Sequence, residues 1–374
     1  MQAAKARTLS PLAIQRIIRA QGENIMNRPK TALCSQFLIL LFACCPLLFF
    51  TATVVDAKIV FCVDDDLYIM NDDGTNRRRL TRNTQSKDRH PRWSPDGKRI
   101  AFTRYMDKTQ IQTSSELFII NADGTEPQQL THNNFNDGSP SWSPDGHHIA
   151  FKSRRSGDNR NGRSDVFVIE LASQTVTQLT GVEDEPSSVE PDWSPDGTQI
   201  TFERFIRIKA GLSPKTIYVM SATGEHQRPL LPDPPIGDTL ILRFRPRWSA
   251  DGQRILFYEF KWRGKQQESQ LVVQRIGSRK KEITDINDRL GSNWIASGKC
   301  WMENDQAILV SLMLKDKPNP NYDIYRYTFD TRGLRRLTRD PSSERYPDWI
   351  QGALSVSPHG KLTQLWAEIK QIER

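Results

Sequence analysis

The pentapeptide Trp-Ser-Pro-Asp-Gly occurs three times, at Trp93–Gly97, Trp142–Gly146 and Trp193–Gly197, and a variant with alanine in place of proline stands at Trp248–Gly252. A proline lies two residues before each tryptophan, and a short apolar run such as Ile100-Ala101-Phe102 follows each glycine. The four tryptophans are separated by 49, 51 and 55 residues. A period of this length is typical of repeat architectures, so we expect a chain built from repeated units.

Each repeat contains the signals of several short strands joined by tight turns. In Ser-Pro-Asp-Gly, proline fixes φ at the second turn position, aspartate suits the third, and glycine adopts the left-handed conformation. Apolar strands that end in a second turn appear at Asp66–Gly74 and Glu116–Gly124, and looser copies begin at Asp165, Thr216, Gln270 and Asp323. Segments ending in Leu-Thr follow at Leu80-Thr81, Leu130-Thr131, Leu179-Thr180 and Leu337-Thr338. Four antiparallel strands per repeat are predicted, which is one blade of a β-propeller.

Counting the repeats predicts the architecture. Degenerate copies of the tryptophan motif at Trp301 and Trp349 bring the total to six. The pattern opens with a lone strand, Lys58–Val63, and closes near Trp349 with a strand that has no following partners. The sequence therefore predicts an all-β fold, a six-bladed β-propeller of four-stranded antiparallel blades. Pairing of the C-terminal strand with the N-terminal blade is expected to close it, which removes exposed sheet edges.

The N-terminal 57 residues have the composition of a targeting segment. Residues 37–55 are almost wholly apolar, basic residues precede them, and Val55-Asp56-Ala57 offers small residues at a cleavage site. We expect a cleaved signal peptide, with Met26 as a plausible start, and a periplasmic or extracellular protein. The alternative is an uncleaved membrane anchor, because the apolar stretch approaches spanning length.

The remaining chain divides into a propeller at 58–357 and a short C-terminal helix or tail at 358–374. Apolar residues recur at helical spacing in that tail, at Leu362, Leu365, Trp366, Ile369 and Ile372. The tail is expected either to pack on the ring or to dock on a partner or a membrane surface. Cys62 and Cys300 are expected to be small buried apolar residues, and a disulfide between them is left open.

Charge and motifs argue against several functional classes. Removal of residues 1–57 lowers the net charge from +8 to about +4, too little to favour nucleic-acid binding. The sequence has no nucleophile elbow, phosphate loop or dinucleotide fingerprint, and its histidines form no metal-ligand motif. The turns account for their own aspartates, so no calcium site is expected. We predict no catalytic residue, metal or cofactor, and a monomer.

The repeat tryptophans are interpreted as core residues that pack one blade on the next. Trp262 does not fit that pattern, and it is the better candidate for a contact residue in a long loop.

Strand alternation places the loops on two faces of the expected propeller. The short-turn face carries Ser-Pro-Asp-Gly and its counterparts, and the long-loop face carries the longer connections, where function usually resides. The longer connections suggest an acidic mouth inside a basic rim, or simply a solvated loop surface. The candidate binding residues are Asp88, Arg89, His90, Asp137, Arg154, Arg155, Glu183, Glu185, Glu190, Arg207, Arg245, Trp262, Arg263 and Arg345.

The repeats resemble the propeller of the TolB family. The resemblance is carried by Pro91–Phe102 and Pro140–Phe151 together with Leu67–Gly74, and it spans Lys58–Val356. It implies a six-bladed ring outside the cytoplasm that works by protein–protein contact. In TolB itself the propeller binds a peptidoglycan-associated lipoprotein over one face. TolB carries an α/β domain before its propeller, whereas here the propeller follows the targeting segment, so a stand-alone TolB-like propeller is expected.

Two functions are predicted from these features. The first is a non-enzymatic exported scaffold that binds a protein or cell-envelope partner through the long-loop face. The alternative is a propeller lyase or hydrolase that acts on an acidic polysaccharide or peptide, because the repeats also look like those of oligogalacturonate lyases and prolyl-oligopeptidase-type peptidases. A hydrolase of the latter kind is not expected, because no catalytic domain follows the ring.

Overall fold

The computed structural model describes residues 57–351, except positions 84, 265 and 292 and segments 108–113, 156–162, 182–186, 206–213, 233–238 and 279–280. The chain separates into two compact units, Met1–Thr53 and Val54–Arg374, and every described residue belongs to the second. The predicted signal segment, apart from Ala57, and the predicted C-terminal helix lie outside the described residues. Among the described helices, none is long and apolar enough to cross a membrane.

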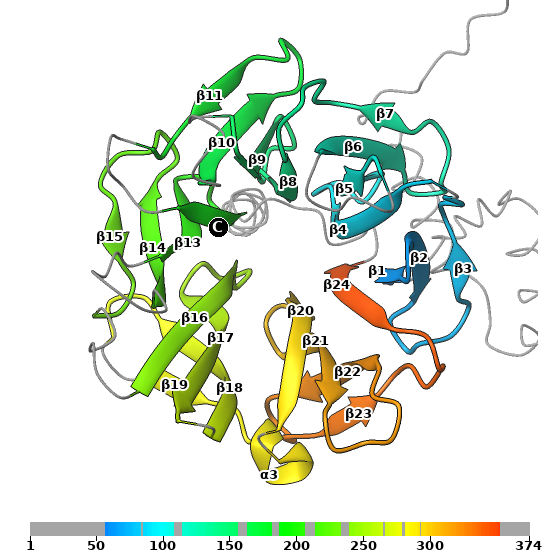
Figure 1. Ribbon diagram of the computed structural model, residues 1–374, viewed down its shortest axis with the longest axis vertical. Helices are drawn as coiled ribbons and strands as arrows, with labels where there is room; N and C mark the ends of the chain where they lie inside the picture. The colour runs from blue at the N-terminus through cyan, green and yellow to red at the C-terminus, as the bar shows by residue number, and fades with distance from the viewer. Residues whose placement is uncertain are drawn as a thin grey trace, which may run out of the picture. The chain divides into compact units, whose positions relative to one another are not determined.

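Three separate sheets of four strands contain the strands from β1 to β11 together with the last strand, β24 (Figure 1). One sheet contains β24 (Glu344–Ile350), β1 (Lys58–Val63), β2 (Asp66–Asn71) and β3 (Arg78–Arg79). The next contains β4 (Lys87–Trp93), β5 (Arg99–Tyr105), β6 (Ser115–Asn121) and β7 (Gln128–Gln129). The third contains β8 (Gly138–Trp142), β9 (His148–Ser153), β10 (Asp165–Glu170) and β11 (Val176–Gln178).

The rest of the chain forms an eight-stranded sheet and another sheet of four. The eight-stranded sheet begins with β12 (Ser188–Trp193), β13 (Gln199–Phe205), β14 (Lys215–Ser221) and β15 (Arg228–Pro229). It continues with β16 (Thr239–Trp248), β17 (Arg254–Arg263), β18 (Gln266–Arg275) and β19 (Lys281–Ile283). One parallel pair, Lys215 with Leu242, joins these two sets of four strands. The last sheet contains β20 (Trp294–Met302), β21 (Ala307–Leu314), β22 (Tyr322–Thr328) and β23 (Leu334–Arg336).

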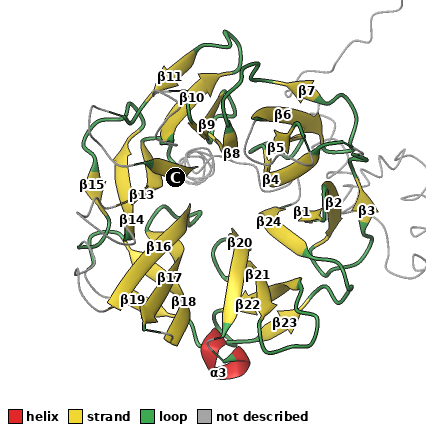
Figure 2. Cartoon of the chain, in the orientation of Figure 1, coloured by secondary structure: helices red, strands yellow, loops and turns green. Residues whose placement is uncertain are grey.

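The all-β character and the four-stranded antiparallel sets confirm that part of the prediction, and Figure 2 shows how completely strands dominate the described chain. The innermost strands contact one another in the order β24, β4, β8, β12, β16, β20 and back to β24. The C-terminal strand β24 pairs antiparallel with β1, from Lys58 opposite Ile350 to Val63 opposite Glu344. The first and last described strands therefore lie in one sheet, where the sequence analysis placed them.

The repeat tryptophans pack between neighbouring sheets, as predicted. Trp93, Trp142, Trp248 and Trp301 are buried, while the half-buried Trp193 and Trp349 pack against apolar clusters. The turns after them also interlock. Gly197 has φ +73°, and a Cβ placed on it would lie 3.2 Å from the ring of Pro144 in the preceding turn. Cys62 and Cys300 are buried free thiols.

The Leu-Thr segments have a structural role that the sequence analysis did not assign. In four repeats the threonine hydroxyl accepts a hydrogen bond from a backbone N–H in the third strand, as between Thr131 and Leu117 at 3.0 Å. The same Thr131 hydroxyl donates to the carboxylate of Glu116 at 2.5 Å. Satisfying buried polar groups in this way ties the outermost strand to the sheet.

Two local features differ from the expectation. A short helix, α3 (Ile286–Leu290), precedes β20, and its Asn287 accepts the indole N–H of Trp294 at 3.0 Å. The long loop predicted at Trp262 is instead a tight hairpin, because β17 and β18 continue until Arg263 pairs with Gln266. The expectation was wrong because the polar residues there alternate with aromatic ones, which suits an extended strand.

We predict that Gly298→Ala weakens the contact between β20 and β24. A Cβ at Gly298 would lie 2.6 Å from the Cα of Tyr346, so β24 would have to move. We expect a loss of about 1–3 kcal/mol in the free energy of unfolding, measured by urea denaturation. Gly277→Asn is the control, since Gly277 has φ +77° and open space around it. It should change stability by less than about 0.5 kcal/mol. Equal effects of the two substitutions would contradict the packing argument.

Candidate functional site

A backbone irregularity recurs in the inner strands and turns particular side chains toward the centre. Three residues before the tryptophan, φ lies between 53° and 55° at His90, Ser139, Glu190, Arg245 and Tyr346. In β20 the corresponding residue is Gly298, and each inner strand shows a register shift near this position. Left-handed backbone costs a non-glycine residue about 1 kcal/mol or more, so its recurrence marks positions that the surrounding fold enforces. A bulge of this kind re-aims a side chain.

These bulge residues converge on a narrow hollow of about 20 Å³. The rings of His90 and Tyr346 are 4.2 Å apart between centroids, and the guanidinium of Arg245 lies 5.1 Å from the Tyr346 ring centroid. The Ser139 hydroxyl donates to Glu190 at 2.8 Å. This hollow, which we call the central hollow, has room for roughly one water molecule.

Burial dominates the electrostatics of the central hollow. It lowers the pKa of His90 to about 3, and no described residue bonds the Nδ1 atom. Burial alone would raise the pKa of Glu190, but its interactions with His90, Lys152 and Arg245 together outweigh burial and hold that pKa below its usual value. Burial and the nearby Arg245 lower the pKa of Lys299, whose Nζ donates to the backbone oxygen of Arg245. The hollow therefore holds a neutral imidazole beside an ionised carboxylate.

Two residues after the bulge position of the inner strands, arginine and aspartate side chains form ion pairs across the centre of the propeller. Arg92 lies 3.3 Å from Asp348 and 3.5 Å from Asp192, and Arg247 lies 2.8 Å from Asp192. Burial raises the pKa of Asp192 to about 6. These side chains join inner strands that are distant in the sequence, and they occupy the centre with paired charges.

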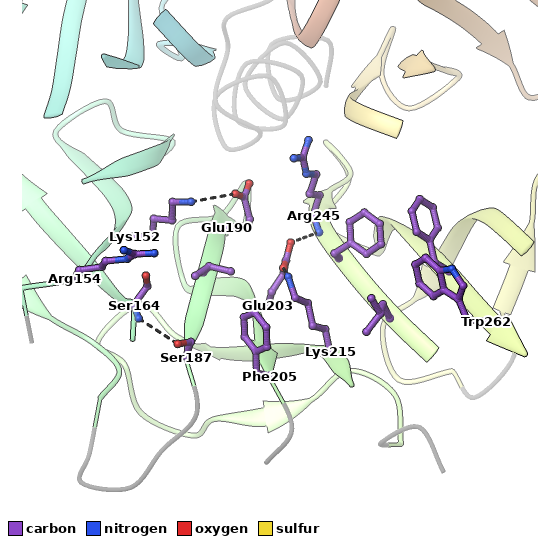
Figure 3. Close-up of a pocket in the computed structure, with 14 residues that line it drawn as sticks. Lys152, Arg154, Ser164, Ser187, Glu190, Glu203, Phe205, Lys215, Arg245 and Trp262 are labelled. Atoms are coloured by element: carbon purple, nitrogen blue, oxygen red, sulfur yellow. Dashed lines mark hydrogen bonds and ion pairs between the residues drawn. The ribbon is translucent and has the colours of Figure 1, made fainter. Parts of the chain in front are cut away.

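A cavity larger than the central hollow lies beside it (Figure 3). It has a volume of about 510 Å³, and we call it the cleft. It spans three successive sets of strands, from β9 to β17. Its lining residues are Lys152, Arg154, Ser164, Ser187, Val189, Glu190, Glu203, Phe205, Lys215, Leu242, Phe244, Arg245, Phe260 and Trp262. Glu190 and Arg245 line both the cleft and the central hollow.

Within the cleft, both carboxylates are partnered. Glu203 lies 3.5 Å from the Nζ of Lys215 and accepts the backbone N–H of Arg245 at 2.7 Å. Burial raises its pKa, although Lys215 opposes this. Glu190 lies 3.9 Å from Lys152. The described residues offer the half-buried guanidinium of Arg154 no such partner.

The structure corrects part of the predicted acidic mouth. Asp88 and Asp137 have no exposed surface, because Arg104 binds the first at 2.8 Å and Arg155 forms an ion pair with the second. Buried carboxylates need such partners, and the arginines come from the adjacent strand or the loop that follows it. Arg155 is therefore engaged inside the protein and is not part of an open basic rim.

Several of the other candidate residues line these two spaces. His90, Glu190 and Arg245 meet at the central hollow, and Arg154 and Trp262 line the cleft. Trp262 is not in a loop as expected. It lies in β17, half-buried, with its ring 5.5 Å from that of Phe260.

Three further candidates, Arg89, Arg263 and Arg345, are described but line neither the central hollow nor the cleft. Arg89 lies 3.3 Å from Asp65, Arg345 stacks over Tyr322 at 4.4 Å, and Arg263 is exposed. Glu183, Glu185 and Arg207 lie outside the described residues. Binding by any of these residues stays a prediction.

Sequence reasoning missed several residues that the structure brings together. Ser139 and Tyr346 occupy the same place before the tryptophan as His90, so that shared position was an available signal. Glu203 and Phe244 are strand residues of unremarkable pattern, and only the packing of neighbouring sheets places them in the cleft. Within the described ranges, no group of three or more histidine, cysteine or carboxylate side chains is arranged to hold a metal ion.

Comparisons with known proteins agree on the fold. A family described as the Tricorn protease N-terminal β-propeller domain matches residues 46–164, less than half of the chain. The crystal structure of TolB from Acinetobacter baumannii superposes with a TM-score of 0.61 at 19% identity, covering 79% of this chain and 67% of that chain. The fold is a TolB-like β-propeller.

Two other solved structures are similar to this chain. Kuenenia stuttgartiensis hydrazine synthase matches with a TM-score of 0.62 at 16% identity, over 80% of this chain and 47% of that chain. An oligogalacturonate lyase from Vibrio parahaemolyticus gives a TM-score of 0.48 at 10% identity, over 73% of this chain and 71% of the other. No curated protein sequence matches significantly. At these identities the likeness concerns the fold alone.

We predict that His90 makes the fold acid-sensitive. Because its pKa falls from 6.5 to about 3 on folding, the unfolded chain binds a proton there that the folded chain does not, and stability falls as pH drops through that window. His90→Asn tolerates the left-handed backbone and removes the titration. Between pH 7 and pH 5 the variant should lose about 2 kcal/mol less than the wild type in urea unfolding. His147→Gln, on an exposed turn, is the control and should keep the wild-type pH dependence.

Proposed function

We propose that this protein is an exported, non-enzymatic binding scaffold that engages a protein or cell-envelope partner through its long-loop face. In this proposal the sheets form six blades, closed into a ring by the pairing of β24 with β1. The cyclic order of contacts between inner strands supports that arrangement. The likeness to TolB supports a periplasmic or extracellular location, as do the features of the N-terminal segment.

The observation that carries the proposal is the cleft of about 510 Å³, in which charged and aromatic side chains line one concave space. Concave sites with a few convergent polar groups are the usual form of binding sites. The turns of the short-turn face offer fewer polar groups to a partner. In its turns the polar groups satisfy one another, as where Ser94 donates to Asp96 at 2.6 Å and Asp96 accepts the N–H of Lys98 at 3.0 Å. A monomer is sufficient for this role.

We predict that a charge reversal in the cleft abolishes partner capture. The immobilised mature protein, with residues 1–57 removed, would be exposed to solubilised envelope proteins and the bound species compared between variants. Arg154→Glu should lose species that the wild type retains, because it reverses the charge of a cationic side chain that lines the cleft. Lys98→Glu, an exposed residue of the short-turn face, is the matched control and should retain them. Identical capture by all three proteins would remove the cleft from the proposal.

The enzymatic alternative rests on one observation. Glu190 and Glu203 line the same cleft, and their pKa values are displaced in opposite directions, the first lowered and the second raised. Pairs of carboxyl groups separated in this way often divide the roles of acid and base. Here, however, both carboxylates already have internal cationic partners.

We therefore expect no turnover of acidic polysaccharides or acidic peptides by the wild-type protein, assayed by product chromatography with and without added divalent cations. Turnover that disappears in Glu203→Gln, while folding is preserved, would overturn the scaffold proposal in favour of a lyase or hydrolase. A matched Glu268→Gln variant, on the exposed part of β18, should leave any such activity unchanged.

A further inference from the structure

We propose that the cleft binds a small organic monoanion whose charge lies beside a flat apolar group, as in an aromatic carboxylate. This inference rests on the proposed function, because it names the ligand class of the same site.

The charge of the lining favours an anion. Four cationic side chains line the cleft against two carboxylates. Glu190 faces Lys152, and Glu203 faces Lys215, so these charges are matched in pairs. Arg245 is drawn toward the ring of Tyr346, and Arg154 has neither an ion pair nor a hydrogen bond among the described residues. The excess positive charge therefore resides on guanidinium groups, which bind a carboxylate through two parallel hydrogen bonds.

The opposite side of the cleft is aromatic. Phe244 and Phe260 meet edge to face with centroids 4.6 Å apart, and Phe260 meets Trp262 at 5.5 Å. Phe244 and Trp262 are only half-buried, so part of each ring faces the open space. In Figure 3, Arg154 and Lys152 lie on one side of the cleft and Trp262 on the other, with Glu203 and Lys215 between them. A flat apolar group suits such aromatic walls, because ring faces and edges pack favourably.

The size and the carboxylates of the cleft limit the ligand further. A volume of about 510 Å³ suits a small molecule, or a group of that size on a larger partner, and is too small to enclose a whole folded protein. The ionised Glu190 would repel a second negative charge placed beside the first. One charge and one apolar body are therefore the features that this lining selects, and a polyanion is disfavoured.

Isothermal titration calorimetry with naphthoate tests the proposal, using naphthalenemethanol as the neutral analogue and acetate as the anion without a ring. We expect naphthoate to bind the full-length protein at least about ten times more tightly than either analogue, since the alcohol lacks the charged hydrogen bonds and acetate lacks the ring that packs on the aromatic side. Raising the salt concentration should weaken the binding of naphthoate.

Two arginine variants complete the experiment. Arg154→Ala should reduce the affinity for naphthoate about tenfold while the unfolding midpoint stays unchanged, because Arg154 has no ion pair or hydrogen bond to lose among the described residues. Arg263→Ala, one residue beyond Trp262 and exposed, should bind like the wild type. Absence of naphthoate binding, equal binding of the neutral alcohol, or an unchanged affinity in Arg154→Ala would each overturn the proposed ligand class. If capture of envelope partners still depends on Arg154 in that case, the scaffold proposal stands and only the ligand class fails.

Discussion

The packing of each repeat tryptophan against the preceding sheet is the contact on which the rest of the structure depends. The indole N–H of Trp142 donates to the backbone oxygen of Arg92 at 3.2 Å, and that of Trp301 donates to Arg247 at 3.1 Å. Arg99, from the preceding sheet, also lies over the Trp142 ring at 4.9 Å. Truncating a buried tryptophan costs about 3–5 kcal/mol. The other repeat indoles have no hydrogen-bond partner among the described residues, so it is the apolar packing of the tryptophans that recurs from sheet to sheet.

Convergence of the inner strands creates a polar centre, which the protein stabilises by pairing its charges. Arg92 is shared between Asp192 and Asp348, and Arg247 provides Asp192 with a second partner. Removing charges from water is costly, so a buried ion is retained only where partners compensate for the lost hydration. The bulges add a second constraint, because they turn one side chain from each inner strand, such as His90 or Glu190, toward the same small hollow.

The inner strands therefore share one backbone conformation but carry different kinds of side chain at the same position. At one repeated position the side chains are imidazole, hydroxyl, carboxylate, guanidinium, a glycine hydrogen and phenol. The asymmetry continues outward into the cleft. There, paired lysine–glutamate contacts adjoin Arg154, which has no ion pair within the described part of the chain, and an aromatic side that includes Trp262. The repeat accounts for the scaffold, and departures from the repeat distinguish one part of the surface from another. The candidate site lies where those departures are concentrated.

The sequence by itself determined the strands, the turns and the buried tryptophans, because each depends on a few neighbouring residues and is repeated along the chain. The sequence also predicted that the strand at Lys58–Val63 pairs with the one at Trp349, since neither belongs to a complete set of four strands along the chain. Only the tertiary structure decided which charges are available. Asp88 looked exposed until packing placed it opposite Arg104, sixteen residues later, and Trp262 looked like a loop residue until β17 extended past it. Exposure and ion pairing depend on contacts between separate segments of the chain, and the local sequence pattern does not indicate which segments come into contact.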